Sequence, residues 1–174
     1  MTTYTIQPGR KAFKPISYRP FFWWVGRTIT FSFQLGANCW YWFEGDDDMY
    51  DWNKGFGLTG YWTRNDRSAI MWAWRPEGLH PFQMCTYINH PNGKREVIEP
   101  FTTNHIAENE IRITRLGKDH FGVDHNGEIV ANVNVNLPWL FRPISPWIGG
   151  ENNEPGSYKS VAPHYMTIKK LRKL

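Results

Sequence analysis

Alternation of apolar and polar side chains is the feature that most restricts the fold of this chain of 174 residues. In the segment 28–35, Thr-Ile-Thr-Phe-Ser-Phe-Gln-Leu, every second position is apolar and the positions between are polar. Successive side chains of a β-strand point to opposite faces, so this pattern predicts a strand with one buried face. Alternation recurs at 69–75, 82–88, 110–116, 120–124, 128–136 and 164–171. No segment has the 3.6-residue period of an amphipathic helix.

Turn signals separate these segments and favour an all-β fold. Asn92-Gly93 and Asn126-Gly127 each precede an alternating or strand-like run, and Asn-Gly favours the two-residue turn of a β-hairpin. Short strands at turn-rich intervals predict an antiparallel β-sandwich, a jelly roll whose last strand pairs with an early one. The aromatic run 40–43, Trp-Tyr-Trp-Phe, also has high strand propensity.

The length favours a single domain with two irregular parts. Residues 1–27 are predicted to be an extended basic arm, because residues 7–20 are rich in proline and basic side chains. Residues 28–174 are predicted to form the sandwich. Within it, 138–163 is expected to be a long loop rich in proline and glycine, and such loops are often functional.

Composition excludes several classes of protein. An aromatic content of 17% argues against disorder, and no apolar run is long enough to predict a membrane span. The first residues lack the basic and apolar regions of a signal peptide, so none is expected. Cys39 and Cys85 cannot build a disulfide framework. Both are expected to lie inside apolar strands, where free cysteine behaves as a small hydrophobic residue.

The net charge of +4 is unevenly placed along the chain. The first twenty and the last six residues carry basic and no acidic side chains, whereas the stretch between them has more acidic than basic ones. Basic ends on an acidic body favour contact with an anionic partner, although solvated ends explain them equally well. Nucleic acid is not expected, since the body lacks an excess of basic residues. The residues expected to bind a partner subunit are Arg10, Lys11, Lys14, Arg19, Lys169, Lys170, Arg172 and Lys173.

Four sequence pieces resemble a known group of domains. They are Asp-Trp-Asn-Lys-Gly-Phe-Gly at 51–57, Ser-Ala-Ile-Met-Trp-Ala-Trp-Arg at 68–75, Tyr-Ile-Asn-His-Pro-Asn-Gly-Lys-Arg at 87–95, and Pro-Trp-Ile-Gly-Gly at 146–150 with Ala-Pro-His at 162–164. They resemble the concanavalin A-like, or laminin-G-like, jelly rolls found in phages and Bacteroidetes-type bacteria. Ile148 replaces the aromatic residue usual in that group. The resemblance implies a β-sandwich over roughly residues 28–171, a fold that hosts lectins, glycan lyases, hydrolases and virion proteins.

Catalytic signatures of such jelly rolls are not found in the sequence. Glu108 and Glu110 share one strand face, and glycosidases use paired carboxylates. However, the Glu-x-Asp-x-x-Glu pattern typical of jelly-roll glucanases is absent, as is the Gln-Ile-His segment of alginate-lyase-like relatives. The six histidines are scattered without the spacing of a zinc site. The sequence therefore predicts no catalytic residue.

One loop is a candidate calcium site. Asp46, Asp48 and Asp51 supply the carboxylate oxygens that Ca²⁺ prefers. Their spacing is not that of an EF-hand, and aspartate also favours turns by bonding to its own backbone, so both interpretations stay open. No other cofactor is expected.

The ten tryptophans suggest contacts with a ligand. Alternation places Trp72 and Trp74 in the core. Indole rings in loops often stack on sugars or pack at interfaces, although they can also hold loops against the sandwich. The candidate glycan-stacking residues are Trp52, Trp62, Trp139 and Trp147.

Two functions follow from these observations. The first is a non-enzymatic virion structural protein of a bacteriophage, a capsid decoration or tail-associated subunit made in the host cytoplasm. Its basic ends would anchor it to other subunits in a homo-oligomer. The alternative is a carbohydrate-binding, lectin-like module, and a glycan-cleaving enzyme is a third and more distant interpretation.

Overall fold

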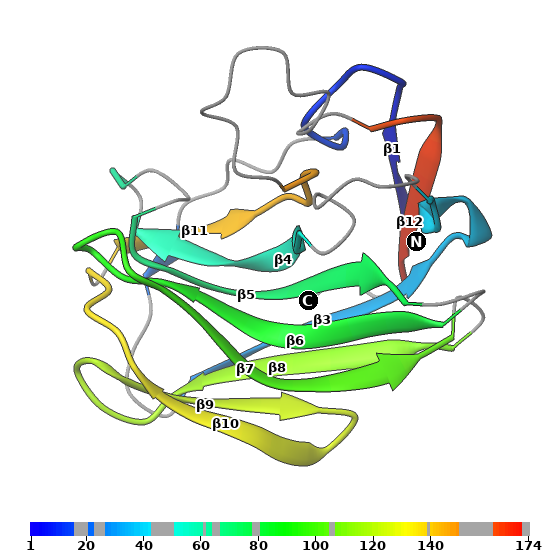
Figure 1. The fold of residues 1–174 in the computed structure, drawn as a ribbon. Helices are drawn as coiled ribbons and strands as arrows, with labels where there is room; N and C mark the ends of the chain where they lie inside the picture. The colour runs from blue at the N-terminus through cyan, green and yellow to red at the C-terminus, as the bar shows by residue number, and fades with distance from the viewer. Residues whose placement is uncertain are drawn as a thin grey trace.

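The alternating segments form two antiparallel sheets that lie face to face (Figure 1). Sheet A has the order β1 (Thr2–Ile6), β12 (Met166–Lys170), β3 (Thr28–Leu35), β8 (Asn109–Arg115), β9 (His120–His125) and β10 (Glu128–Asn134). Sheet B has the order β2 (Phe21–Phe22), β11 (Leu140–Ile144), β4 (Asn53–Gly60), β5 (Ala69–Pro76), β6 (Phe82–Asn89) and β7 (Arg95–Thr103). The computed structural model describes residues 1–15, 21–22, 27–42, 51–60, 62–63, 67–77, 81–104, 107–138, 140–149 and 162–171.

The predicted all-β sandwich is confirmed. The last strand, β12, lies between β1 and β3, as a jelly roll requires. Both predicted hairpins are present, and Gly93, Asn126 and Gly127 have the positive φ angles that their turns need. Within the described residues the one helix is the single turn η1 (Ala37–Cys39). No helix in this part of the chain has the length and apolar character needed to span a membrane.

Three predictions about local structure are wrong. Residues 140–144, expected to belong to the long loop 138–163, form β11 because they pair with β2 and β4. Cys39 lies in η1 and not in a strand. Residues 40–42 of the aromatic run lie outside any strand, because the chain leaves η1 there instead of pairing; residue 43 lies outside the described residues. Strand β4 was not predicted, because Gly55, Gly57 and Gly60 interrupt the alternation and a bulge lies between Lys54 and Gly57.

The aromatic core lies between the two sheets. Trp72 and Trp74 of β5 are buried in it, as the alternation predicts. Phe33 of β3 stacks on Trp72 with ring centroids 4.0 Å apart and planes 3° from parallel. Phe13, far from any alternating segment, is also fully buried in this cluster. These contacts hold the two sheets in a fixed relation to each other.

The described part of the expected N-terminal arm lies against the sandwich. Strand β1 pairs with β12 over its whole length, and the two lie side by side in Figure 1. Ala12 pairs with Trp147, and the Phe13 amide donates to the carbonyl of Pro146 at 3.0 Å. Ala12 therefore extends the edge of sheet B at the end where Asn53 and Lys54 lie, whereas Lys14 pairs with Thr5 of β1 in sheet A.

Candidate functional site

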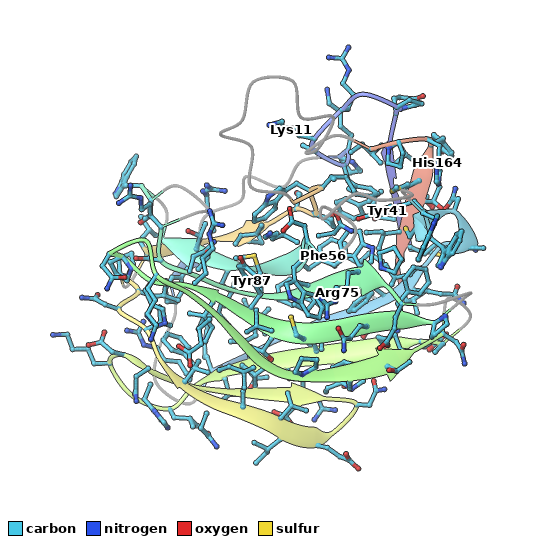
Figure 2. All side chains as sticks on the ribbon, viewed as in Figure 1. Lys11, Tyr41, Phe56, Arg75, Tyr87 and His164 are labelled. Atoms are coloured by element: carbon cyan, nitrogen blue, oxygen red, sulfur yellow. The ribbon has the colours of Figure 1, made fainter. Side chains whose placement is uncertain are left out.

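The outer face of sheet B brings together polar side chains from β4, β5 and β6. Register places Lys54 beside Ala73, which is opposite Cys85. In the adjacent rows Met71 lies opposite Tyr87, and Arg75 lies opposite Gln83. These residues alternate with the buried Trp72 and Trp74, so they point away from the core. In Figure 2, Tyr87 and Arg75 both lie over the middle strands of this sheet.

Lys54 and Tyr87 form the centre of this face. The Lys54 ammonium lies 4.6 Å from the centroid of the Tyr87 ring. It also donates a hydrogen bond to the carbonyl oxygen of Trp52. Tyr87 is buried, with 5% of its surface exposed, whereas Lys54 is half-buried. An amine and a phenol on one face of a sheet are groups that can act as base and acid on the same substrate.

Arg75 is held beside this pair. Its guanidinium carbon lies 4.5 Å from the centroid of the Trp52 ring, a cation–π geometry. Its Nε donates to the side-chain oxygen of Gln83 at 2.7 Å. The contacts with Trp52 and Gln83 fix the planar group that best recognises a carboxylate.

The three strands that carry this group of side chains contain basic but no acidic residues. Lys54 lies on β4 and Arg75 on β5, and β4, β5 and β6 contain no aspartate or glutamate. Both cations act on Cys85: they lower the pKa of its thiol, while burial, the larger effect, raises that pKa well above its ordinary value. The thiol therefore stays protonated and is not a nucleophile. The face is suited to an anionic ligand.

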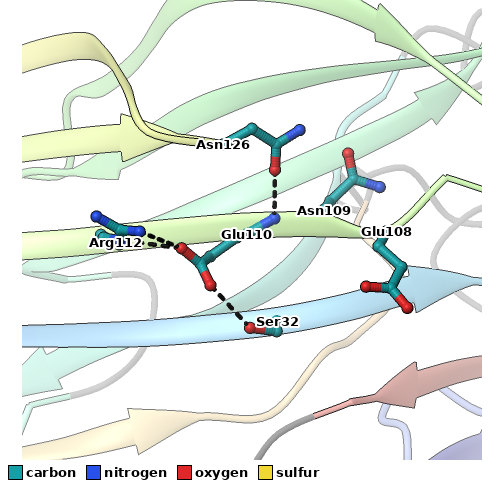
Figure 3. Close-up of a pocket in the computed structure, with 6 residues that line it drawn as sticks. All are labelled: Ser32, Glu108, Asn109, Glu110, Arg112 and Asn126. Carbon is teal, nitrogen blue, oxygen red and sulfur yellow. Dashed lines mark hydrogen bonds and ion pairs between the residues drawn. The ribbon is translucent and has the colours of Figure 1, made fainter.

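A pocket of about 270 Å³ lies on the outer face of sheet A (Figure 3). Glu108 and Glu110, the predicted carboxylate pair, line it together with Ser32, Asn109, Arg112 and Asn126. Arg112 lies 2.7 Å from the Glu110 carboxylate, and Ser32 donates to the same group at 3.3 Å. Because Glu110 is engaged with Arg112 and Ser32, its carboxylate is not suited to general acid–base work.

The predicted glycan-stacking tryptophans do not form one surface in the described residues. Trp52 and Trp147 are partly buried on the outer face of sheet B, where Arg75 occupies one side of the Trp52 ring. Trp62 follows β4 at the far end of that strand and is 84% exposed. Trp139 lies outside the described residues.

The predicted calcium site falls mostly outside the described residues. Asp46 and Asp48 lie outside the described residues, and Asp51 is half-buried. Among the described residues, no three side chains of histidine, cysteine, aspartate or glutamate gather as metal ligands would. Binding of Ca²⁺ by Asp46, Asp48 and Asp51 therefore stays a prediction.

The predicted partner-binding residues have several environments. Arg10, Lys11, Lys14 and Lys169 are exposed. Lys170 instead points toward the core, with its ammonium 5.5 Å from the centroid of the Phe31 ring, and burial lowers its pKa. Arg19, Arg172 and Lys173 lie outside the described residues. Their binding to a partner subunit stays a prediction.

Sequence reasoning missed Lys54, Arg75 and Tyr87. A usable signal was present, because placing Trp72 and Trp74 in the core leaves Arg75 on the opposite face. Pairing 69–76 with 82–89 as neighbouring antiparallel strands would then have placed Gln83 and Tyr87 on that same face. Lys54 could not be added, since its strand was not predicted.

Comparison with known proteins shows the fold and names no family. No protein-family model matches the chain, and no curated protein matches it. Alginate lyase Aly36B is a similar solved structure, with 12% identity and a TM-score of 0.60 over 95% of this chain and 76% of that chain. An Aly36B variant with a lysine and a methionine replaced by alanine, bound to alginate trisaccharide, has 15% identity and a TM-score of 0.58 over 98% and 81%. The Crh5 transglycosylase has 10% identity and a TM-score of 0.54 over 98% and 72%.

These comparisons correct the functional expectation. The main prediction, a non-enzymatic virion structural protein, is wrong, because the similar structures are carbohydrate-active enzymes. The prediction failed because the alternation of side chains predicts only the β-sandwich fold, and both structural proteins and enzymes have this fold. The concanavalin A-like fold is supported, whereas the link to phages is not. Nothing in the structure bears on the predicted location in a virion.

Proposed function

We propose that the chain is a lyase that cleaves an anionic, uronate-containing polysaccharide of the alginate type on the outer face of sheet B. The observation that carries the proposal is the contact of Lys54 with Tyr87, 4.6 Å from Nζ to the ring centroid, beside Arg75. The three strands that carry these residues hold no carboxylate that would repel a uronate.

The similar structures support this choice of substrate. Aly36B was captured with alginate after a lysine and a methionine, or a lysine and a tyrosine, had been replaced by alanine. The outer face of sheet B presents the same three residue types together: Lys54 contacts Tyr87, and Met71 is the strand partner of Tyr87. At 12 to 15% identity this likeness is support for the proposal and not an assignment.

The proposed reaction is a β-elimination. Arg75 pairs with the uronate carboxylate, which makes the hydrogen on the adjacent carbon more acidic. Lys54 first releases its own proton to solvent, and its amine then takes the proton from the sugar carbon; the electron pair left behind forms the carbon–carbon double bond as the glycosidic bond breaks. The Tyr87 hydroxyl gives its proton to the leaving glycosidic oxygen. No water is consumed.

The test is incubation of the chain with polymannuronate, polyguluronate, pectate and a neutral glucan. Cleavage of an acidic polymer should generate ultraviolet absorbance from the unsaturated uronate, and the product masses should add up to the substrate without a water molecule. Absence of unsaturated products from every acidic polymer would contradict the proposal.

A carbohydrate-binding module without activity is the second candidate. It is favoured by the low exposure of Tyr87 and by the hydrogen bond that already engages Lys54 with Trp52. For this candidate, the same polymers should bind, as measured by affinity electrophoresis, and should remain uncleaved.

A further inference from the structure

Residues 147–149, part of the Pro-Trp-Ile-Gly-Gly motif, lie directly against Lys54. The backbones of Lys54 and Trp147 exchange two hydrogen bonds, of 2.9 and 2.8 Å. These bonds place the next residues of the segment beside the Lys54 side chain. The motif therefore has a definite place at the edge of the candidate site.

Asn53 fixes the position of this segment from the other side of the strand. Its side chain is fully buried. It donates to the Tyr41 hydroxyl at 2.8 Å and accepts from the Gly149 amide at 3.3 Å. A single amide thus connects the segment 147–149 with the segment that follows η1. A buried and satisfied polar contact of this kind specifies one arrangement.

The Lys54 ammonium occupies the space in which a side chain at position 149 would lie. A Cβ atom on Gly149 would overlap the Lys54 ammonium and the Trp52 carbonyl that accepts its hydrogen bond. Gly149 is not among the glycines with positive φ, so close approach is the reason for a glycine here.

The N-terminal segment supports the same arrangement from outside. The Ile148 amide donates to the Lys11 carbonyl at 2.8 Å, and Ala12 pairs with Trp147. Figure 2 labels Lys11, near the N-terminal part of the ribbon. Residues 147–149 are therefore held between Lys54 and residues 11–12 and have little freedom to move away.

We propose that Gly149 and Asn53 are positioning residues that hold the Lys54 ammonium over the Tyr87 ring. Lysine has a long, flexible side chain, so its amine needs an external constraint to stay in one place. The expected effect of these two residues on catalysis rests on the proposed function. The geometry itself can be tested without activity.

The first measurement is the NMR signal of the Lys54 ε-methylene group in protein labelled with ε-¹³C lysine. The Tyr87 ring current should shift this proton signal upfield, and Lys54→Arg identifies it by its loss. Gly149→Ala should return the signal toward that of a free lysine. Tyr41→Phe removes the hydrogen bond to Asn53 without adding volume, so it should move the Lys54 signal part of the way toward that of a free lysine.

Gly117→Ala is the matched control. A Cβ at Gly117 meets its nearest neighbour at 3.4 Å, an ordinary contact, in a turn of sheet A. It should leave the Lys54 signal unchanged. An unshifted Lys54 signal in the wild-type chain would overturn the inference even if Gly149→Ala failed to fold. So would a Lys54 signal that stays in place in a folded Gly149→Ala variant.

The activity measurement separates this inference from the proposed function. Misplacing a catalytic group by about 1 Å can cost about 10²-fold. Gly149→Ala should therefore lower kcat on the cleaved polyuronate by about that factor, with a smaller change in KM. A Lys54 signal that behaves as described, without any cleavage, refutes the lyase and keeps the constraint. Cleavage with kcat unchanged in Gly149→Ala refutes the constraint and keeps the lyase.

Discussion

The outer faces of the two sheets differ in how their charges are arranged. On sheet A, Glu110 is paired with Arg112 and bonded to Ser32, so its charge is neutralised within the face. On sheet B, Lys54 and Arg75 lie on strands without any carboxylate, and their side chains rest on a carbonyl, an amide and aromatic rings. The two outer faces therefore hold their charged side chains by different kinds of contact in the described residues.

Paired carboxylates in the sequence were therefore a poor guide to the site. Carboxylates two residues apart on a strand are easy to find, but here one of them lies beside an arginine on its own strand. The groups suited to chemistry are spread over three strands. Variants on the two faces distinguish which of them carries the function.

The largest effect is expected from Lys54→Ala. Loss of a general base costs about 10² to 10⁴-fold in rate, so cleavage of the polyuronate should fall by that much while circular dichroism stays unchanged. Glu110→Gln, on the other face, should cleave at the wild-type rate. Equal rates of cleavage for wild type and Lys54→Ala would contradict a catalytic role for the outer face of sheet B.

The second prediction compares two neighbours on β5 that face opposite ways. Trp74→Ala should lower the free energy of unfolding by about 3–5 kcal/mol, because it removes a buried indole from the core. Arg75→Gln should change it by less than about 1 kcal/mol, since the side chain is half-buried on the outer face. Urea denaturation measures both. Similar losses would mean that Arg75 is mainly structural.

The strands and hairpins were predictable because their information is local. Period-two alternation and Asn-Gly turns need only a few neighbouring residues, and β3 begins and ends where the alternation does. Strand β1 was missed because its stability depends on pairing with β12 at the other end of the chain. The site was missed for a similar reason: Lys54 meets Tyr87 only through the register of three strands.

A third and smaller effect is expected from Arg75→Lys. Lysine keeps the charge but lacks the planar, two-pronged donor that fits a carboxylate. KM for the polyuronate should rise about tenfold, the scale of one weakened hydrogen bond to a charged group. Steady-state kinetics measures this change. Arg112→Lys on sheet A is the control, and an equal rise in KM for both variants would contradict the assignment of the face.

The smallest effect concerns the seam between the sheets, where His125 of β9 stacks on Phe101 of β7 with centroids 3.9 Å apart. Burial lowers the pKa of His125, against the opposing effect of Glu128. Below the ordinary histidine pKa of about 6.5 the unfolded chain therefore binds a proton that the folded chain does not, and stability falls.

The measurement is Tm as a function of pH. Acidification through and below the ordinary histidine pKa should lower Tm, and His125→Gln should reduce this pH dependence. An unchanged pH dependence in the variant would mean that other groups cause the acid destabilisation.

Mapping of a bound oligosaccharide tests directly whether the outer face of sheet B is the polyuronate site. Alginate tetrasaccharide would be titrated into ¹⁵N-labelled Lys54→Ala chain, in which cleavage is suppressed. If the sugar binds on this face, the amide signals of residues 52–54, 73–75 and 83–87 should shift. Shifts confined to the pocket of Ser32, Glu108 and Glu110 on sheet A, or no shifts at saturating sugar, would contradict it.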